Sequence, residues 1–182
     1  MILVQIESLK AGDVTIEGYK GQNFFVADSF SFGVEREMKE SGEKGGTEDI
    51  NIGVGELQEC TISKSVDRAS TLLAQYAING NSLGRARIDF VEIGGAGGNE
   101  GLPHCYMRYV LDRVFVKSWS TSGDADDRPT EEVAFYYNRI GFQYLSTTDG
   151  KSYEASTLMS WDNVSNTKDW KKGSPDLALK LG

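Results

Sequence analysis

The chain contains one histidine, His104, which stands directly before Cys105, one of two cysteines. A histidine that deprotonates a cysteine would create a thiolate nucleophile. Adjacent residues of a strand point to opposite faces, so this pair cannot meet within the strand predicted around it. One histidine and two distant cysteines also fall short of the ligands that a zinc site needs. We therefore predict a half-buried strand histidine, no metal, and free thiols at Cys60 and Cys105, with one disulfide as the alternative.

Ser70 and Asp67 lie in SVDRASTLLAQYAING (65–80), the one stretch that reads clearly as a helix. A Ser-Lys nucleophile needs a lysine three residues after the serine, and Leu73 stands there. Because no base is nearby in the sequence, we predict that Ser70 is a serine on the helix surface. Ser65 or Asp67 is expected to cap the helix N-terminus, where a carboxylate also opposes the positive end of the dipole.

Two glycine-rich connectors and one acidic turn complete no ligand site. The connectors GEKGGT (42–47) and GGAGGNEG (94–101) lack the spacing of phosphate-binding loops. In GDADDRPTEE (123–132), Arg128 occupies a position where a calcium loop needs an oxygen ligand. We predict a solvated acidic turn, no cofactor and no catalytic residue. These features favour a binding or structural protein over an enzyme.

Composition indicates one globular domain of ordinary hydrophobicity. The chain has 182 residues, 39% of them hydrophobic and 25% charged, with a formal net charge of −8. This acidic balance argues against nucleic-acid binding, which needs clustered lysine and arginine. No apolar run approaches the ~20 residues of a membrane span. The start MILVQIESLK has no basic region or cleavage site, so we expect a first strand and cytoplasmic folding.

The elements that must position these residues are mostly strands. Runs rich in β-branched and aromatic residues predict strands at 2–9, 23–35, 50–63, 84–93, 104–118, 132–146 and 153–161. Within 132–146 the apolar positions change phase, which predicts a bulge or bend near Asn138–Arg139. The pattern indicates an all-β barrel or sandwich with one inserted helix.

The helix and one strand each show two distinct faces. In DSFSFGV (28–34), Ser29 and Ser31 share a small polar face, and Phe30, Phe32 and Val34 share the opposite one. The helix carries an apolar stripe, and Gly80 suits its C-terminal end. The members of the stripe recur at helical spacing: Ala69, Leu72, Leu73, Tyr76 and Ala77.

Four stretches carry a family pattern in one order along the chain. They are VADSFSFGVER (26–36), TISKSVDRASTLL (61–73), RPTEEVAFYYNRIGFQY (128–144) and SWDNVSNTK (160–168). Together they resemble the haemolysin-coregulated proteins (Hcp), the tube subunits of bacterial type VI secretion systems. The chain departs from the pattern at Thr71, Arg68 and Ser160, where proline, lysine and glycine are usual. The resemblance covers about residues 3–168.

The resemblance implies a mainly β fold, a single-domain β-barrel of two antiparallel sheets with one flanking α-helix at about 65–79. This domain would span residues 1–170, with 171–182 as a short tail. The chain would form homohexameric rings that stack into a hollow tube, hold effector proteins in the lumen, and meet sheath and spike components. It would be cytoplasmic during assembly and then secreted to the extracellular space without a signal peptide. No catalysis, cofactor, nucleic acid or membrane insertion is expected.

The resemblance also assigns roles to particular residues. Ser31 and Ser29 become candidates for contact with cargo in the lumen. The loop 37–49 is expected to reach neighbouring subunits and the next ring, through Glu37, Lys39, Glu40, Glu43, Lys44, Glu48 and Asp49. The helix is expected to be structural, through Asp67, Leu72, Leu73 and Tyr76.

Two alternatives stay open at this point. One is a tail-tube subunit of a phage-like contractile particle, which shares the same idea of the fold. The other is a monomeric β-sandwich module that binds a ligand such as carbohydrate on Trp119, Trp161 or Trp170. An exposed aromatic platform would support the binding module, whereas a stable hexamer without ligand would count against it.

Overall fold

The computed structural model describes residues 1–40, 50–52, 55–93, 103–146 and 154–168 of the chain. Most of the described residues lie in strands, and one helix, α1 (Ser70–Asn79), interrupts them. No helix in the described part of the chain has the length and apolar character needed to cross a membrane. The strands are β1 (Ile2–Ile6), β2 (Phe24–Ala27), β3 (Ser29–Ser31), β4 (Val34–Glu35), β5 (Met38–Glu40), β6 (Ile50–Ile52), β7 (Glu56–Leu57), β8 (Cys60–Ser65), β9 (Gly84–Ile93), β10 (Pro103–Ser122), β11 (Thr130–Tyr136), β12 (Arg139–Ser146), β13 (Glu154–Ala155) and β14 (Met159–Asp162).

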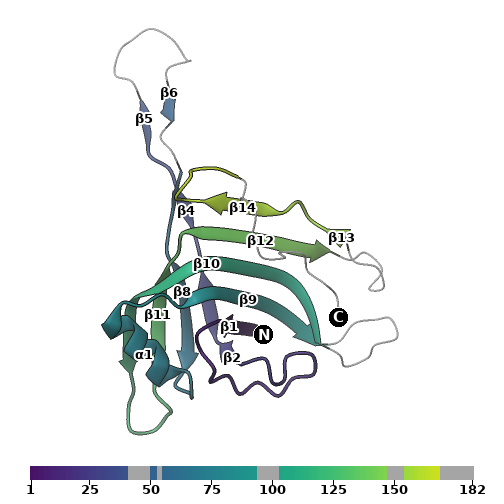
Figure 1. The fold of residues 1–182 in the computed structure, drawn as a ribbon, viewed down its shortest axis with the longest axis vertical. Coiled ribbons are helices and arrows are strands. Elements are labelled where there is room, and N and C mark those ends of the chain that lie inside the picture. Colours follow the sequence, from purple (N-terminus) through teal and green to yellow (C-terminus); the bar gives the residue numbers. More distant parts are fainter. Residues whose placement is uncertain (41–49, 53–54, 94–102, 147–153, 169–182) are drawn as a thin grey trace.

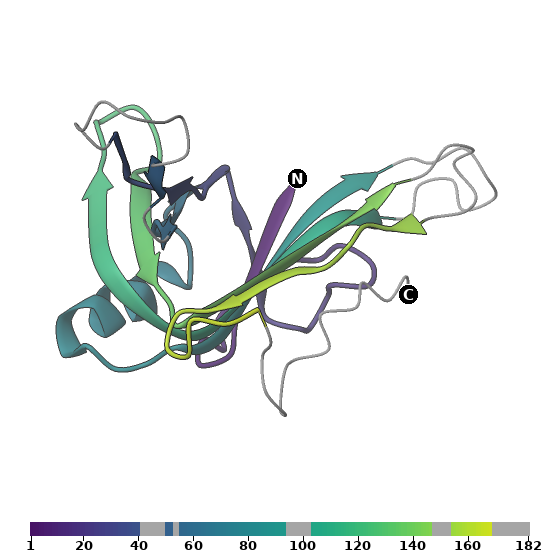
Figure 2. The same ribbon diagram turned by 90° about the horizontal axis from the view of Figure 1, so that it is seen from above.

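Strand β10 is long enough to belong to two sheets. Its first part pairs with β9 and β12, and these continue to β1, β2, β13 and β14; we call this sheet A. Its second part, Phe115–Ser122, pairs with β11, followed by β8 and β3; we call this sheet B. All of these pairings are antiparallel. Figure 2 shows the two sheets meeting at an angle along the bend of β10.

The strand order begins at β2 and ends at β3, and these two strands are consecutive in the chain. Only Asp28 lies between them, and its N–H donates to the carbonyl oxygen of Ser63 in β8 at 2.8 Å. The segment 24–31 therefore leaves sheet A and joins the edge of sheet B. This arrangement confirms the predicted mainly β fold of two antiparallel sheets with one helix beside them (Figure 1).

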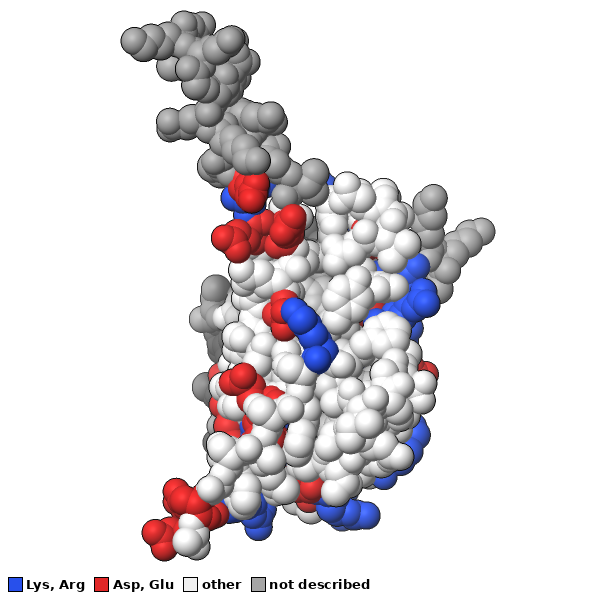
Figure 3. Space-filling view, turned by 90° about the vertical axis from the view of Figure 1, so that its left-hand side faces the viewer, with Lys and Arg blue, Asp and Glu red and all other residues white. Residues whose placement is uncertain are grey.

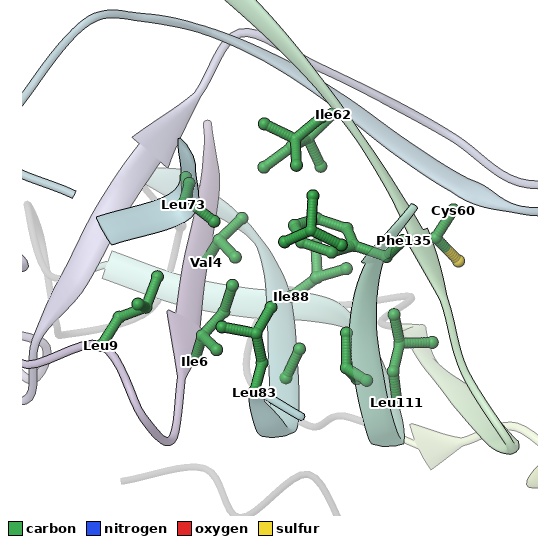
Figure 4. Close-up of a cluster of buried hydrophobic side chains, with 14 of the residues drawn as sticks. Val4, Ile6, Leu9, Cys60, Ile62, Leu73, Leu83, Ile88, Leu111 and Phe135 are labelled. Atoms are coloured by element: carbon green, nitrogen blue, oxygen red, sulfur yellow. The ribbon is translucent and has the colours of Figure 1, made fainter. Parts of the chain in front are cut away.

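The hydrophobic core fills the space between the two sheets and the helix. Figure 4 shows Val4 and Ile88 of sheet A, Ile62 and Phe135 of sheet B, and Leu73 of α1 together in this space. All five side chains are fully buried. Because apolar burial contributes roughly 25 cal/mol per Å², this shared core holds the sheets at their mutual angle.

The helix is shorter than predicted, and it begins at Ser70 rather than near Ser65. Residues 60–65 pair with β11, so Ser65 is the last residue of β8 and cannot cap the helix. Gly80 ends the helix with φ of 69°, as predicted for its C-terminal position. The predicted apolar stripe is confirmed, because Leu73 is buried while Leu72 and Tyr76 are half-buried against the core.

Two further expectations about strands are corrected. The change of phase near Asn138–Arg139 is the bend of the two predicted alternatives, not the bulge: the chain bends at Asn138, and the predicted strand 132–146 is divided into β11, which ends at Tyr136, and β12, which begins at Arg139. Because β11 lies in sheet B and β12 lies in sheet A, the residues that face the core are odd-numbered in β11 and even-numbered in β12. The predicted loop 37–49 begins with a strand, since Lys39 and Glu40 belong to β5, which pairs with β6 and stands away from the sheets in Figure 1. Glu43, Lys44, Glu48, Asp49 and the tail 171–182 lie outside the described residues.

We expect the mutation Leu73→Ala to lower the free energy of unfolding by about 2–5 kcal/mol, because it leaves a cavity in the core. Ile78→Ala is the matched control, since Ile78 lies on the same helix with 87% of its surface exposed. Urea unfolding followed by circular dichroism measures both variants. Equal losses of stability in the two would show that α1 is not anchored through Leu73.

Candidate functional site

Small hydroxyl side chains line the face of sheet B that points away from the core. Residues of the core face alternate with them along β8 and β11, and Ile62, Val133 and Phe135 are fully buried. Because opposite residues of paired strands share a face, the register places the outward residues in three rows. The rows are Ser31, Thr61, Ala134 and Ser118; Ser29, Ser63, Glu132 and Ser120; and Ser65, Thr130 and Ser122. We call these residues the hydroxyl face.

The predicted two-sided character of β3 is confirmed. Ser29 and Ser31 are exposed, whereas Phe30 between them packs against the core and against Phe90, with ring centroids 5.6 Å apart. The hydroxyl oxygens of Ser29 and Ser63 lie 2.6 Å apart, which joins β3 to β8 through side chains as well as backbone. Val34 departs from the prediction, because it belongs to β4 and is exposed.

Few charged side chains interrupt this face (Figure 3). Glu132 lies in the middle row. Lys117 is the extra residue of a β-bulge in β10, between Val116 and Ser118, and its ammonium group pairs with Glu59. Figure 3 views the molecule from the side of β11 and α1, where a broad uncharged surface surrounds one cationic side chain that contacts an anionic one.

Sequence reasoning found only two members of the hydroxyl face. Ser29 and Ser31 stand in the alternating stretch SFS, and the same signal occurs in TISKS (61–65) and SWSTS (118–122). In TISKS small polar residues alternate with Ile62 and Lys64, and in SWSTS with Trp119 and Thr121; SWSTS pairs with β11 across one turn, whereas the pairing of TISKS with β11 is long-range. The alternation could have identified each segment, whereas only the register shows that they form one surface.

A buried polar cluster lies beneath the hydroxyl face, where α1 meets sheet B. The Nζ atom of Lys64 donates to Glu131 Oε1 at 2.7 Å and lies 2.8 Å from Asp67 Oδ1. Ser70 Oγ donates to Glu131 Oε1 at 2.9 Å, and Trp119 Nε1 donates to Glu131 Oε2 at 2.8 Å. Lys64 and Glu131 are fully buried, so each satisfies the other's charge.

The position of Ser70 corrects the prediction of a surface serine. Its side chain is buried and lies 3.2 Å from Lys64 Nζ, although no lysine follows it at the spacing expected from sequence. The ammonium group of Lys64 donates to Ser70 Oγ, and it also contacts two carboxylates and the carbonyl oxygen of Ser65, so Lys64 is not placed as a base for Ser70. Asp67 does not cap the helix as predicted, because the N-cap is Ala69 and no side chain caps it; Asp67 Oδ1 instead accepts the N–H of Ala69 itself at 2.8 Å. The cluster joins the helix to β8 and β11.

A second buried polar cluster lies on the outer face of sheet A. Asp89 of β9 is fully buried and accepts hydrogen bonds from Arg108 Nε at 2.6 Å, Arg87 Nη2 at 2.6 Å and the Tyr19 hydroxyl at 3.1 Å. Burial alone would raise the pKa of Asp89, but the hydrogen bonds and charges of Arg108 and Arg87 outweigh it and hold this pKa below its ordinary value. One buried carboxylate therefore fixes two guanidinium groups.

The cysteines and tryptophans carry no reactive or ligand-stacking feature in the described part of the chain. Cys60 and Cys105 are free thiols, as predicted, and burial raises the pKa of the Cys60 thiol to about 12 and that of Cys105 to about 11. His104 is half-buried on β10, as predicted. Trp119 and Trp161 are half-buried against the core, so neither forms an exposed platform, and Trp170 lies outside the described residues. The described residues contain no group of three or more potential metal ligands.

The mutation Lys64→Met should lower the free energy of unfolding by about 3–5 kcal/mol, because it leaves Glu131 buried without its cationic partner. Lys117→Met is the control, since it removes the cation of a solvent-exposed pair and should cost at most about 1 kcal/mol. Denaturant unfolding at neutral pH compares the two. A Lys64→Met protein as stable as the control would contradict the role assigned to the buried pair.

Asp89 should make stability depend on pH in the acid range. Its pKa is lower in the folded than in the unfolded protein, where about 3.9 is usual. Its ionised form therefore stabilises the fold at neutral pH, and this contribution is lost as the pH falls below about 5. Asp89→Asn should be less stable at pH 7 and show a smaller further loss on acidification, measured by urea unfolding from pH 7 to pH 3. Asp13→Asn, at an exposed position, should keep the wild-type pH profile.

The sequence matches a family model described as "Type VI secretion system effector, Hcp" over residues 3–144. A comparison with curated proteins finds no match. A solved structure described as a type six secretion system protein is 22% identical with a TM-score of 0.78, covering 92% of this chain and 98% of its own. Hcp1 from Salmonella typhimurium is 18% identical with a TM-score of 0.67, covering 92% and 97%.

A third solved structure, the secreted protein Hcp3 from Pseudomonas aeruginosa, is 17% identical with a TM-score of 0.59. The alignment covers 89% of this chain and 99% of that one. At such identities the structures demonstrate a shared fold, and the family assignment rests on the sequence model.

Proposed function

Since the chain belongs to the Hcp family of type VI secretion system proteins, we propose that it is a structural subunit of the inner tube of such a system. Six copies would form a ring, and rings would stack into a hollow tube. The observation that carries this proposal is the hydroxyl face, the surface of sheet B directed away from the core, which is built from small, mostly uncharged side chains.

The hydroxyl face suits the wall of a channel through which proteins pass. Serine and threonine hydroxyls both donate and accept hydrogen bonds, so they can meet many different polar surfaces. The short side chains lose little rotamer entropy and leave the channel wide. In the ring, sheet B would face the lumen, and Ser29 and Ser31 would contact effector proteins that the ring holds.

The β5–β6 hairpin is the proposed contact between stacked rings. It stands away from the sheets (Figure 1), and its strand β5 contains Lys39 and Glu40. Glu37 precedes it, and Glu43, Lys44, Glu48 and Asp49 complete the charged set proposed for this contact. Each copy has a formal net charge of −8, so a ring of six would carry a formal net charge of −48. Stacking through charged side chains should therefore depend strongly on salt.

The tube subunit would meet sheath and spike components of the secretion machine as well as its own copies. It would fold and assemble in the cytoplasm and then be secreted to the extracellular space. We propose no catalytic activity. In this account the polar clusters around Lys64 and Asp89 hold elements in place, and neither presents a reactive group to a substrate.

The variants Ser31→Gln and Ser120→Gln test the lumen assignment. Both positions lie on the hydroxyl face, and the longer side chains should obstruct cargo while the ring remains intact. We expect at least about a tenfold loss of a co-expressed effector protein in co-purification, equivalent to about 1.4 kcal/mol of binding free energy. Thr15→Gln, at an exposed position outside sheet B, is the control and should retain cargo. Unchanged cargo retention in both hydroxyl-face variants, with rings intact, would remove the basis for placing sheet B in the lumen.

A further inference from the structure

A cationic groove opens on the outer face of sheet A, beside the buried Asp89 cluster. It has a volume of about 410 Å³ and lies between the end of β1, the start of β9 and the interior of β10 at Arg108 and Val110. Four of its side chains are cationic and one is anionic. The lining residues are Gln5, Glu7, Lys10, Arg85, Arg87, Arg108 and Val110. A concentration of positive charge is unusual for a chain whose formal net charge is −8.

Hydrogen bonds to the carboxylates of Asp89 and Glu7 hold the arginine residues of the groove in place. Asp89 binds the guanidinium groups of both Arg87 and Arg108 from below. The backbone N–H of Arg85 donates to Glu7 Oε2 at 3.0 Å, which fixes the wall between β1 and β9. Arg85 Nε also lies 3.9 Å from Asp112 Oδ1, so the four positive charges are set against Glu7, Asp89 and Asp112 and leave a formal excess of one. The guanidinium groups of Arg87 and Arg108 are thus oriented in advance as part of the groove wall, and they add positive potential to the site where Lys10 and Arg85 would meet a carboxylate.

The turn between β10 and β11 offers the complementary charge. Asp124, Asp126 and Asp127 are exposed there, and Arg128 reduces the formal charge of the turn to −2. Asp124 Oδ1 accepts the N–H groups of Asp126 at 3.1 Å and Asp127 at 3.2 Å, which fixes the backbone of the turn. The carboxylates of Asp126 and Asp127 are thus presented on an ordered turn at the surface.

The turn and the groove lie on opposite sides of the molecule. In Figure 2 the β10–β11 turn lies at the upper left, whereas the outer face of sheet A, where the groove opens, is directed to the lower right. A ring of identical subunits needs a head-to-tail contact between two different surfaces of the same chain. Two surfaces of opposite charge on opposite sides meet that requirement.

We propose that the cationic groove receives the acidic turn of a second copy of this chain. The proposal rests on the ring assembly proposed above and identifies one of its contacts. Arginine and carboxylate groups form short, charge-assisted and often bidentate hydrogen bonds, so Asp126 and Asp127 would meet Arg85 and Lys10 at the rim of the groove. Charge complementarity of this kind fixes the orientation of partners and accelerates their association.

Charge reversal and its compensation test the contact. The groove variant carries Lys10→Glu with Arg85→Glu, and the turn variant carries Asp126→Lys with Asp127→Lys. A combined variant carries all four changes. The control is Lys20→Glu with Arg68→Glu, an equal change of charge at exposed positions outside the groove. Analytical ultracentrifugation at about 0.1 M salt gives the protein concentration at which half of each variant is assembled.

We expect the groove and turn variants to need at least about a tenfold higher concentration than wild type. The combined variant should recover most of that loss, and the control should behave as wild type. Assembly of the groove variant at the wild-type concentration, or no recovery in the combined variant, would overturn the proposed contact. Thermal unfolding checks that each variant is folded, and the single changes Lys10→Glu and Asp126→Lys replace any pair that is not.

The two proposals fail in different ways. If wild type assembles and charge reversal has no effect, the groove contact is wrong and the ring stands. If wild type stays monomeric at every concentration, both the ring and the contact are wrong.

Discussion

The architecture depends on β10, one continuous strand that pairs in two sheets. Pro103–Val114 pairs with β9, and Phe115–Ser122 pairs with β11. The bend between these parts sets the angle between sheets A and B, and the core fills that angle. Because each sheet buries one face in the same core, its other face is turned away from that core, and on sheet A part of this other face is covered by a second cluster of Leu3, Val14, Tyr19, Phe24 and Val91. The hydroxyl face and the cationic groove therefore lie on different sides of the molecule.

Two buried ion pairs complete this arrangement at the places where apolar packing ends. Lys64 and Glu131 join α1 to sheet B, and Asp89 holds Arg87 and Arg108 on sheet A. A buried ion pair contributes little net stability compared with apolar groups, but it is costly to break and it selects one geometry. In this protein the two clusters fix the surfaces that we propose for cargo and for a neighbouring subunit.

The sequence predicted local features better than long-range ones. Alternation identified the two faces of Ser29–Ser31, and helical spacing identified Leu73, because both signals come from neighbouring residues. The start of the helix was placed too early, since the pairing of Ser65 with Thr130 is invisible to local spacing. Ser70 was assigned to the surface for the same reason. Its partner Glu131 is 61 residues away, and pairing of β8 with β11 brings the two together. The groove likewise joins residues from β1, β9 and β10 that share no motif.

The central claim is that copies of this chain form a ring whose inner wall is sheet B. A cryo-electron microscopy reconstruction of the purified protein tests this claim most directly. The account predicts a six-fold annulus in which the strand row from Ser31 to Ser118 faces the central hole. A ring with sheet B on its outer surface, or a field of single subunits at assembly concentrations, would contradict it.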